Sequence, residues 1–355
     1  MAKRLTLLLL VTAALGLSSA RGVILFGTGD PAANTTPPTG LLAGSGWQSQ
    51  TERIPGATAI GAVAFLTAAH LATPVGGELQ FDGLTYWVQR TADAPGSDLR
   101  LLEIAGRLDS NRVSGIFTGD DEVGRGLVIH GFGQQRGTAV FLDGPAGPEL
   151  RGWHWGTMGG RPRWGTNVVT RVSDDAATGH FLHAVFSGDA GADEATVSFG
   201  DSGGGIFLQN ARGGWDLAGV TYDVEKFFAL TAAVDRFIAS LFDRRGYFSQ
   251  HDDGIWEEIP LTTDQPGSAW QATRVSQYQD WIREQTALPP ATDWPRLHSA
   301  LSPAGPFTEH SAYAVDPKRR LVTFKSSGEQ LYFHLGDNTH IQSIRTGDGI
   351  VELTY

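Results

Sequence analysis

Short runs of apolar residues separated by glycine-rich turns dominate the chain between residues 57 and 222. Residues 57–69 are almost entirely apolar, which predicts a pair of buried strands. Residues 79–88 alternate around Asp82 and Gly83, a two-residue signal for a β-hairpin. Strands this frequent, without long helices between them, predict an antiparallel barrel or sandwich. The further expected strands are 97–104, 126–132, 138–142, 167–172, 181–186 and 215–222.

The pattern changes after residue 222. Residues 230–242 are compatible with a helix, and residues 250–264 are polar and acidic. We interpret residues 223–267 as a long surface insertion. Residues 272–283 return to apolar positions at helical spacing, which predicts a helix that ends before the prolines at 289 and 290.

The double proline predicts a linker, and the remainder reads as a separate small β module over residues 286–355. Strands are expected at 321–324, 330–335 and 350–355. The tail contains no reactive combination of side chains, and we expect such a module to bind a surface or a partner.

The first 20 residues have the pattern of a signal peptide. Lys3 and Arg4 precede an apolar segment at 5–17 that is too short to span a bilayer, and small residues follow at 18–20. We expect the mature chain to begin near Arg21 and to be exported, as a secreted, periplasmic or cell-surface protein. No later run is long enough for a membrane span.

Composition narrows the class of partner. The chain has 355 residues, of which 18% are charged and 41% apolar, as in folded soluble proteins. Its formal net charge of −11 argues against a nucleic-acid partner, because phosphate binding needs a basic face. The absence of cysteine excludes disulfides, thiol nucleophiles and thiolate metal sites. We expect neither a metal nor a cofactor.

Residues 200–205 have the sequence GDSGGG, which points to a reactive serine. The glycines allow backbone conformations that turn several amide N–H groups toward one point beside Ser202. The alternative is an ordinary surface turn, since Gly, Asp and Ser are common turn formers.

A reactive serine needs a base and a carboxylate that orients the base. His70 is the best candidate base, because it ends the long apolar run 57–69; the alternative is a strand-end histidine with a satisfied hydrogen bond. Asp98 directly precedes an apolar stretch, an expensive place for a charge without a partner. Asp93 is its competitor but lies in a more polar, turn-like context.

These residues together resemble the chymotrypsin/trypsin family of serine peptidases. The resemblance rests on three motifs, TAAH at 67–70, DLRLL at 98–102 and GDSGG at 200–204, which follow the family's order His, Asp, Ser. Residues 215–220 are similar to the strand that follows the family's serine, and residues 273–282 to its closing helix.

The resemblance spans residues 22–285 and implies a trypsin-like peptidase domain over 21–285. It implies that the chain is a secreted, bacterial-type member of the family that lacks cysteines. It implies a mainly β fold of two antiparallel six-stranded β-barrels with the Ser-His-Asp triad in the cleft between them, plus a C-terminal helix. His70 would act as general base, Asp98 would orient it, and Ser202 would attack a peptide carbonyl. The backbone N–H groups of Gly200 and Ser202 would form the oxyanion hole. The implied activity is that of a serine endopeptidase that forms an acyl-enzyme.

The chain departs from the family pattern in several places. Leu71 stands where the family usually has cysteine, Gly205 where it often has proline, and the spacing from His70 to Asp98 is short. In the family, Asp201 commonly pairs with an amine freed by cleavage, and the sequence RGVI at 21–24 offers a site for that cleavage.

The substrate pocket is assigned by counting back from the serine. Thr196 would lie at its base, with Tyr222, Asp223 and Trp270 in or near its walls. A neutral threonine gives no reason to expect cleavage after Lys or Arg, whereas Asp223 keeps that preference open. Two other functions stay open: a binding protein that keeps the peptidase shape without cleaving, and an esterase that uses the same triad.

Overall fold

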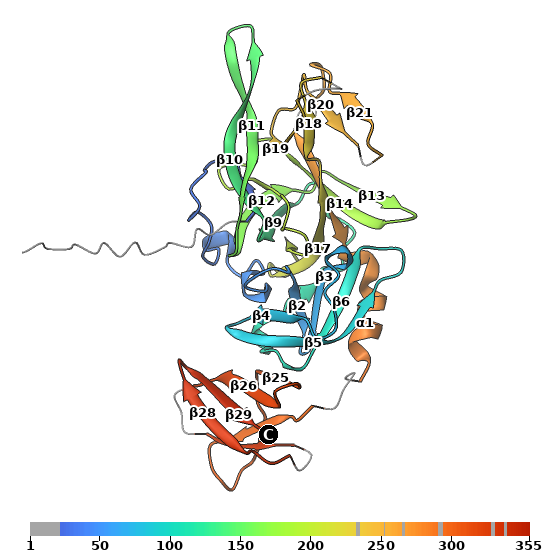
Figure 1. The fold of residues 1–355 in the computed structure, drawn as a ribbon. Helices are drawn as coiled ribbons and strands as arrows, with labels where there is room; N and C mark the ends of the chain where they lie inside the picture. Colours follow the sequence, from blue (N-terminus) through green and yellow to red (C-terminus); the bar gives the residue numbers. More distant parts are fainter. Residues whose placement is uncertain are drawn as a thin grey trace, which may run out of the picture.

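The structure is a computed structural model that describes residues 22–231, 235–251, 253–264, 267–289, 294–327, 331–336 and 339–355. The predicted signal peptide, residues 1–20, and the expected cleavage site at Arg21 lie outside the described residues. The fold is mainly β with a single α-helix in the described part of the chain, which confirms the predicted class (Figure 1).

The first sheet contains five antiparallel strands in the order β2-β3-β6-β5-β4. The predicted strand pair within 57–69 and the hairpin at Asp82-Gly83 are confirmed. Asp82 and Gly83 have φ of +48° and +71°, the positive values that a tight two-residue hairpin turn requires. The strands are β2 (Thr58–Gly61), β3 (Ala64–Ala68), β4 (Glu78–Phe81), β5 (Leu84–Asp93) and β6 (Leu99–Ile104).

The second sheet contains eight strands, seven of them in the order β12-β9-β16-β17-β22-β14-β13, with β8 paired to β17. Residues 167–172 are not one strand as expected, because they cover the end of β12 and the start of β13. The strands are β8 (Gly115–Ile116), β9 (Gly126–Gly131), β12 (Arg163–Val168), β13 (Arg171–Asp175), β14 (Gly179–Phe186), β16 (Gly205–Gln209), β17 (Trp215–Val224) and β22 (Ser268–Arg274). A short pair, β1 (Ile24–Leu25) and β15 (Ala195–Thr196), packs its apolar residues into the same core.

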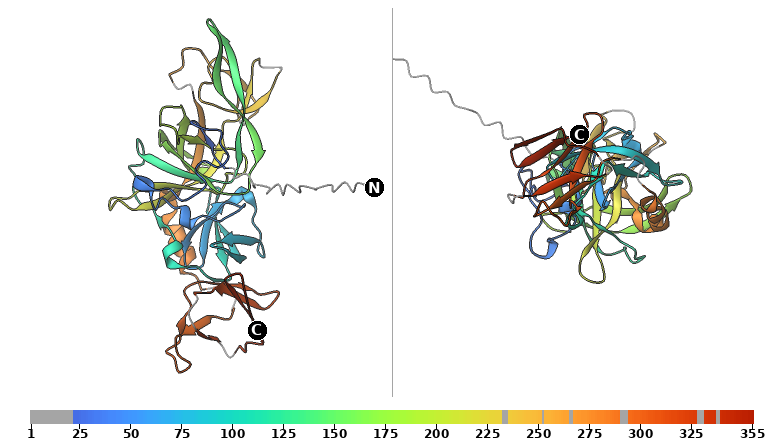
Figure 2. Two further views of the ribbon diagram at one scale, coloured as in Figure 1. Left: turned by 90° about the vertical axis from the view of Figure 1, so that its left-hand side faces the viewer. Right: turned by 90° about the horizontal axis from the view of Figure 1, so that it is seen from below.

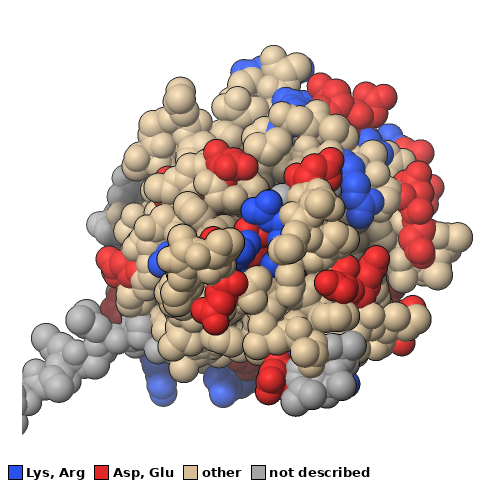
Figure 3. Space-filling model, turned by 90° about the horizontal axis from the view of Figure 1, so that it is seen from above, with Lys and Arg blue, Asp and Glu red and all other residues tan. Residues whose placement is uncertain are grey.

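A third sheet, in the order β10-β11-β19-β18-β20-β21, takes β18, β19, β20 and β21 from the segment expected to be a surface insertion. The long hairpin of β10 and β11 projects from the body beside β18, β20 and β21 (Figure 1). Seen from above, acidic groups surround a hollow in which Lys and Arg atoms lie (Figure 3). The strands are β10 (Gln134–Gly144), β11 (Gly147–Met158), β18 (Phe227–Ala229), β19 (Phe237–Leu241), β20 (Phe248–Gln250) and β21 (Trp256–Glu258).

The helix-compatible segment 230–242 forms no helix in its described part. Its described C-terminal part forms β19, which pairs with β11 on one side and β18 on the other. Ala239 and Leu241 are fully buried in the core of this sheet. Tertiary pairing therefore overrides the local helix-compatible pattern.

The helix expected over 272–283 is displaced toward the C-terminus. Residues 268–274 form β22, a short 3₁₀ turn follows at Val275–Tyr278, and α1 spans Gln279–Ala287. The helix ends before Leu288, as predicted. Val275, Tyr278 and Ile282 pack with apolar residues of both the first and the second sheet, so this segment joins the two halves of the body.

The C-terminal tail is a β structure, as expected, and it pairs with a strand of the first half of the body. Its strand β25 pairs with β7 (Gly106–Arg107), so β7 completes a five-stranded sheet β28-β29-β26-β25-β7. Ion pairs from Arg107 to Glu309 (3.0 Å) and from Lys325 to Asp82 (2.7 Å) add to the contact. The tail strands are β23 (Leu297–Ala300), β24 (Thr308–Glu309), β25 (Tyr313–Asp316), β26 (Leu321–Lys325), β27 (Tyr332–Leu335), β28 (Ser343–Gly347) and β29 (Ile350–Thr354).

The tail lies at the opposite end of the molecule from the β10–β11 hairpin in both side views (Figures 1 and 2). Within the described residues, no helix has the length and apolar character needed to cross a membrane.

Candidate active site

The loop that carries Ser202 consists of two consecutive β-turns. The Asp201 N–H donates to the Ser198 carbonyl (3.1 Å), and the Gly204 N–H donates to the Asp201 carbonyl (3.0 Å). The third positions of these turns are Gly200, with φ +92°, and Gly203, with φ +82°. Positive φ at that position is the reason for glycine in a type II turn.

Three amide N–H groups of the two turns have no acceptor in the described part of the chain, those of Phe199, Gly200 and Ser202. The amides of Asp201, Gly203, Gly204 and Gly205 all have acceptors. Two of these three donors, those of Gly200 and Ser202, are the pair that the sequence assigned to an oxyanion hole. The loop can therefore offer two N–H groups to one negative oxygen beside the serine.

Asp201 anchors this loop from inside the protein. Its fully buried carboxylate accepts hydrogen bonds from the amides of Gly133 and Ser198, both 2.7 Å, and from the Ser198 hydroxyl (2.9 Å). Burial raises the pKa of Asp201 to about 6, even though these hydrogen bonds act in the opposite direction. Arg163 is buried, and burial lowers its pKa, while the negative charges of Asp201 and Asp30 act in the opposite direction.

His70 lies in a 3₁₀ turn (Ala69–Leu71) directly after β3, and Asp98 lies directly before β6. Because β3 and β6 pair with Ala68 opposite Leu99, the two side chains come together at the end of the ladder. Asp98 Oδ2 lies 2.7 Å from His70 Nδ1, and Oδ1 accepts the backbone N–H of His70 at 2.8 Å.

This carboxylate fixes the imidazole. A carboxylate can only accept, so the Nδ1 atom carries the hydrogen and the Nε2 atom is left as the acceptor of a neutral ring. The ring also meets Tyr222 edge to face, with centroids 6.0 Å apart, and Phe181 stacks on Tyr222 at 5.1 Å. The competing carboxylate, Asp93, is instead bound by two nitrogens of the Arg100 guanidinium, Nε at 2.5 Å and Nη2 at 2.9 Å.

The serine loop packs against the segment that carries the histidine. A Cβ at Gly203 would overlap the carbonyl oxygen of Gly56 and lie 2.9 Å from the Leu71 side chain. The Gly203 amide also donates to the Thr221 carbonyl at 3.0 Å. Close backbone approach at Gly203 therefore brings the loop of the second sheet onto the first.

His70 and Ser202 line one pocket of about 350 Å³. Tyr222 and Asp223, two of the expected pocket residues, line it as well. Asp223 is not a free charge, because its Oδ1 atom lies 2.7 Å from the Lys226 ammonium. The remaining lining residues are Val197, Ser198, Phe199, Thr221 and Val224.

The other two expected pocket residues lie elsewhere. Thr196 is fully buried in β15, opposite Ile24, and is not among the residues that line this pocket. Trp270 is 2% exposed, packs in the core of the second sheet and lines a different cavity. Side chains alternate along a strand, so the residue after Thr196, Val197, lines the pocket instead.

Sequence reasoning missed five lining residues: Val197, Ser198, Phe199, Thr221 and Val224. The first three lie just before the serine motif, and the other two flank Tyr222 and Asp223, so their only signal was proximity to positions already chosen. Within the described residues, no group of three or more His, Cys, Asp or Glu side chains is arranged to hold a metal ion.

Comparison with known proteins adds little to this geometry. No protein family and no curated protein matches the chain. Among solved structures, neuropsin, described as a serine protease expressed in the limbic system of mouse brain, is similar with a TM-score of 0.42 and 14% identity. The similarity covers 68% of this chain and 96% of that one. The function must therefore be inferred from the residues of the site.

The burial of Asp201 predicts a specific pH dependence of stability. Its pKa in the folded protein, about 6, lies above the ordinary value of 3.8 for an aspartate, so the folded state holds the proton more tightly. The contribution of Asp201 to the free energy of unfolding is thus greatest below about pH 4. It declines as the pH rises through 6, by at most about 3 kcal/mol.

The measurement is the free energy of unfolding of the wild type minus that of Asp201→Asn, taken at intervals from pH 4 to pH 7. We expect this difference to fall steadily with increasing pH. A difference that stays constant, or that rises, would show that the Asp201 carboxyl is not perturbed in this way.

Proposed function

We propose that this chain is a serine endopeptidase in which Ser202, His70 and Asp98 act together. The observation that carries the proposal is the shared pocket: His70, held by Asp98 through Nδ1, lines it together with Ser202. Two amides free of acceptors, those of Gly200 and Ser202, lie in the same loop. Base, nucleophile and oxyanion donors are the three parts that acyl transfer requires.

In the first half-reaction the Ser202 Oγ atom forms a bond to the substrate carbonyl carbon as its proton passes to His70 Nε2. The carbonyl oxygen becomes an oxyanion that accepts the N–H groups of Gly200 and Ser202. Asp98 stabilises the imidazolium through Nδ1–H. The C–N bond then breaks, the amine leaves with the proton from Nε2, and an ester to Ser202 remains.

In the second half-reaction a water molecule attacks the ester carbonyl while His70 Nε2 takes its proton. The tetrahedral intermediate again places its oxygen on the two amides. Collapse returns the proton to Ser202 Oγ and releases the acid, so the enzyme is restored.

The lining of the pocket supports a preference for uncharged substrate side chains. Val197, Val224 and Thr221 line it and are nearly or fully buried, and its one carboxylate, Asp223, is paired with Lys226. A basic substrate side chain would have to compete with Lys226 for Asp223. Export remains a prediction from the sequence of residues 1–20.

Two other functions differ in what they predict. An esterase would share all of these residues but leave peptides intact. A binding protein that has lost activity would not react at Ser202 at all.

A serine-directed fluorophosphonate separates these functions. We expect it to label the chain of residues 21–355 at Ser202, because His70 removes the hydroxyl proton during attack. Peptide mapping identifies the labelled residue. Ser202→Ala should abolish the label, and Ser302→Ala, in an exposed turn of the tail, should keep it.

Folded protein without label at Ser202 would refute catalysis. Label at Ser202 with hydrolysis of small esters, but no cleavage in a diverse peptide library, would establish the esterase instead.

Substitution of Gly200 tests the oxyanion donors. Alanine at φ +92° is strained, and relief of the strain turns the amide of residue 200. We expect kcat of Gly200→Ala to fall about 100-fold or more, as for loss of one oxyanion donor. The matched control is Gly213→Ala, which has a similar φ of +79° and nothing within 4 Å of the added carbon. Equal activity losses in both variants would count against the assignment.

Substitution of Lys226 tests the specificity of the pocket. Lys226→Gln removes the partner of Asp223, so cleavage after Lys or Arg should increase in kcat/KM by about threefold to tenfold relative to cleavage after Ala or Val. Sequencing of cleaved peptides measures both ratios. Lys318→Gln, exposed in the tail, should leave them unchanged. A wild-type enzyme that already prefers Lys or Arg would contradict the neutral pocket.

A further inference from the structure

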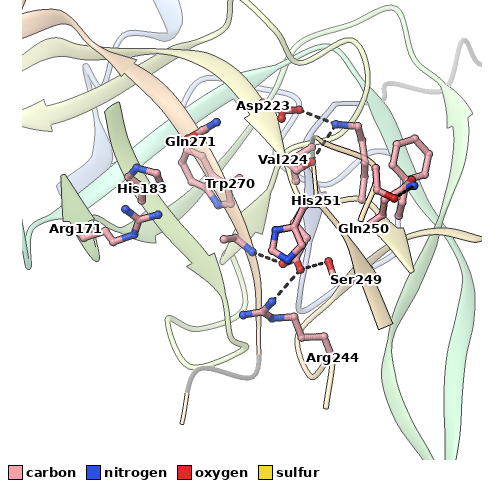
Figure 4. Close-up of a pocket in the computed structure, with 15 residues that line it drawn as sticks. Arg171, His183, Asp223, Val224, Arg244, Ser249, Gln250, His251, Trp270 and Gln271 are labelled. Carbon is pink, nitrogen blue, oxygen red and sulfur yellow. Dashed lines mark hydrogen bonds and ion pairs between the residues drawn. The ribbon is translucent and has the colours of Figure 1, made fainter. Parts of the chain in front are cut away.

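A second cavity, of about 510 Å³, lies beside the pocket of Ser202. Asp223 and Val224 line both, so these two residues form a shared wall. Strands of the second sheet form one side of the cavity. Residues around β18 and β20, within the segment 223–267, form the other side (Figure 4).

A row of polar residues crosses the second sheet along this cavity. Arg171 on β13 lies opposite His183 on β14, His183 lies opposite Gln271 on β22, and Gln271 lies opposite Asp223 on β17. Residues directly opposite one another across neighbouring strands share a face of the sheet. All four line the cavity.

The carboxylates of the cavity are already paired. Asp223 is bound by Lys226 at 2.7 Å, and Glu225 by Arg244 at 2.9 Å. Glu225 also accepts hydrogen bonds from the Ser249 hydroxyl and, at 3.2 Å, from the Ala269 amide. These contacts compensate both negative charges.

Arg171 is the cation of the cavity that has no ion pair with any described residue. Burial lowers the pKa of His183, and the positive charge of Arg171 lowers it further, to about 4. His183 is therefore neutral near pH 7, and the uncompensated charge of the cavity is the positive charge of Arg171.

Trp270 lines the cavity from the core of the second sheet, so its hydrogen-bond donor is not exposed to a ligand. The Nε1 atom of Trp270 is buried and has no acceptor in the described part of the chain. An indole N–H can only donate. The cation without an ion pair, Arg171, is therefore the group that suits a ligand with negative charge on oxygen.

We propose that this cavity binds an acidic side chain of the peptide substrate, with its carboxylate at Arg171. The inference rests on the proposed peptidase function, because the shared wall puts the cavity next to the pocket in which the scissile bond would lie. One free cation matches a single carboxylate. Lys226 and Arg244, which a phosphate or a polyanion would need, are already paired within the protein.

The test uses a peptide that the wild-type enzyme cleaves, resynthesised with a single Glu, Gln or Lys at each of four positions on either side of the scissile bond. At one position or more, we expect kcat/KM for Glu to exceed that for Gln about threefold to tenfold, through KM. Arg171→Gln should remove this preference, and Arg171→Glu should reverse it in favour of Lys. The control is Arg212→Glu in the exposed turn between β16 and β17, which should keep the preference for Glu.

The outcomes separate the inference from the function on which it rests. An enzyme that cleaves and reacts with fluorophosphonate, but shows no charge preference at any position, would refute the acidic subsite alone. An unchanged preference in Arg171→Gln would also refute it. A folded wild-type chain that neither cleaves peptides nor reacts at Ser202 would refute the function and the subsite together.

Discussion

A single buried carboxylate organises the reactive loop. Asp201 has no exposed surface, and its oxygens are occupied by two backbone amides and a hydroxyl. Burying such a group without these partners would cost several kcal/mol, so the loop has little freedom to leave the conformation that supplies them. The same conformation sets the two glycines at positive φ and leaves the amides of Gly200 and Ser202 free. The geometry around Ser202 therefore depends on a contact that a substrate never reaches.

The parts of the site that the sequence predicted are those whose chemistry is local. GDSGGG encodes two turns through glycine, and the apolar runs before His70 and after Asp98 encode two neighbouring strands. The pairing of those strands then brings the imidazole and the carboxylate together. Such a pattern can be predicted from the sequence because each residue type serves the local structure of its immediate neighbours in the chain.

The parts that the sequence did not predict depend on distant contacts. Counting back from Ser202 gave Thr196 but not the direction of its side chain, and the strand pairing with Ile24 turns that residue into the core. Residues 237–241 form a strand because β11 and β18 lie on either side of them. The charges of the insertion suggested a solvated surface. In the structure, Glu225 pairs with Arg244 and Lys226 pairs with Asp223 within the wall of a cavity.

The pairing of β7 with β25 has a consequence for the order in which the molecule can form. The ion pair beside it, Arg107 to Glu309, joins residues 202 positions apart. Contacts so distant in sequence close late and slowly, because the entropy of a long loop is lost before the contact compensates for it. The first half of the body therefore acquires its last strand partner only when the C-terminal segment is present.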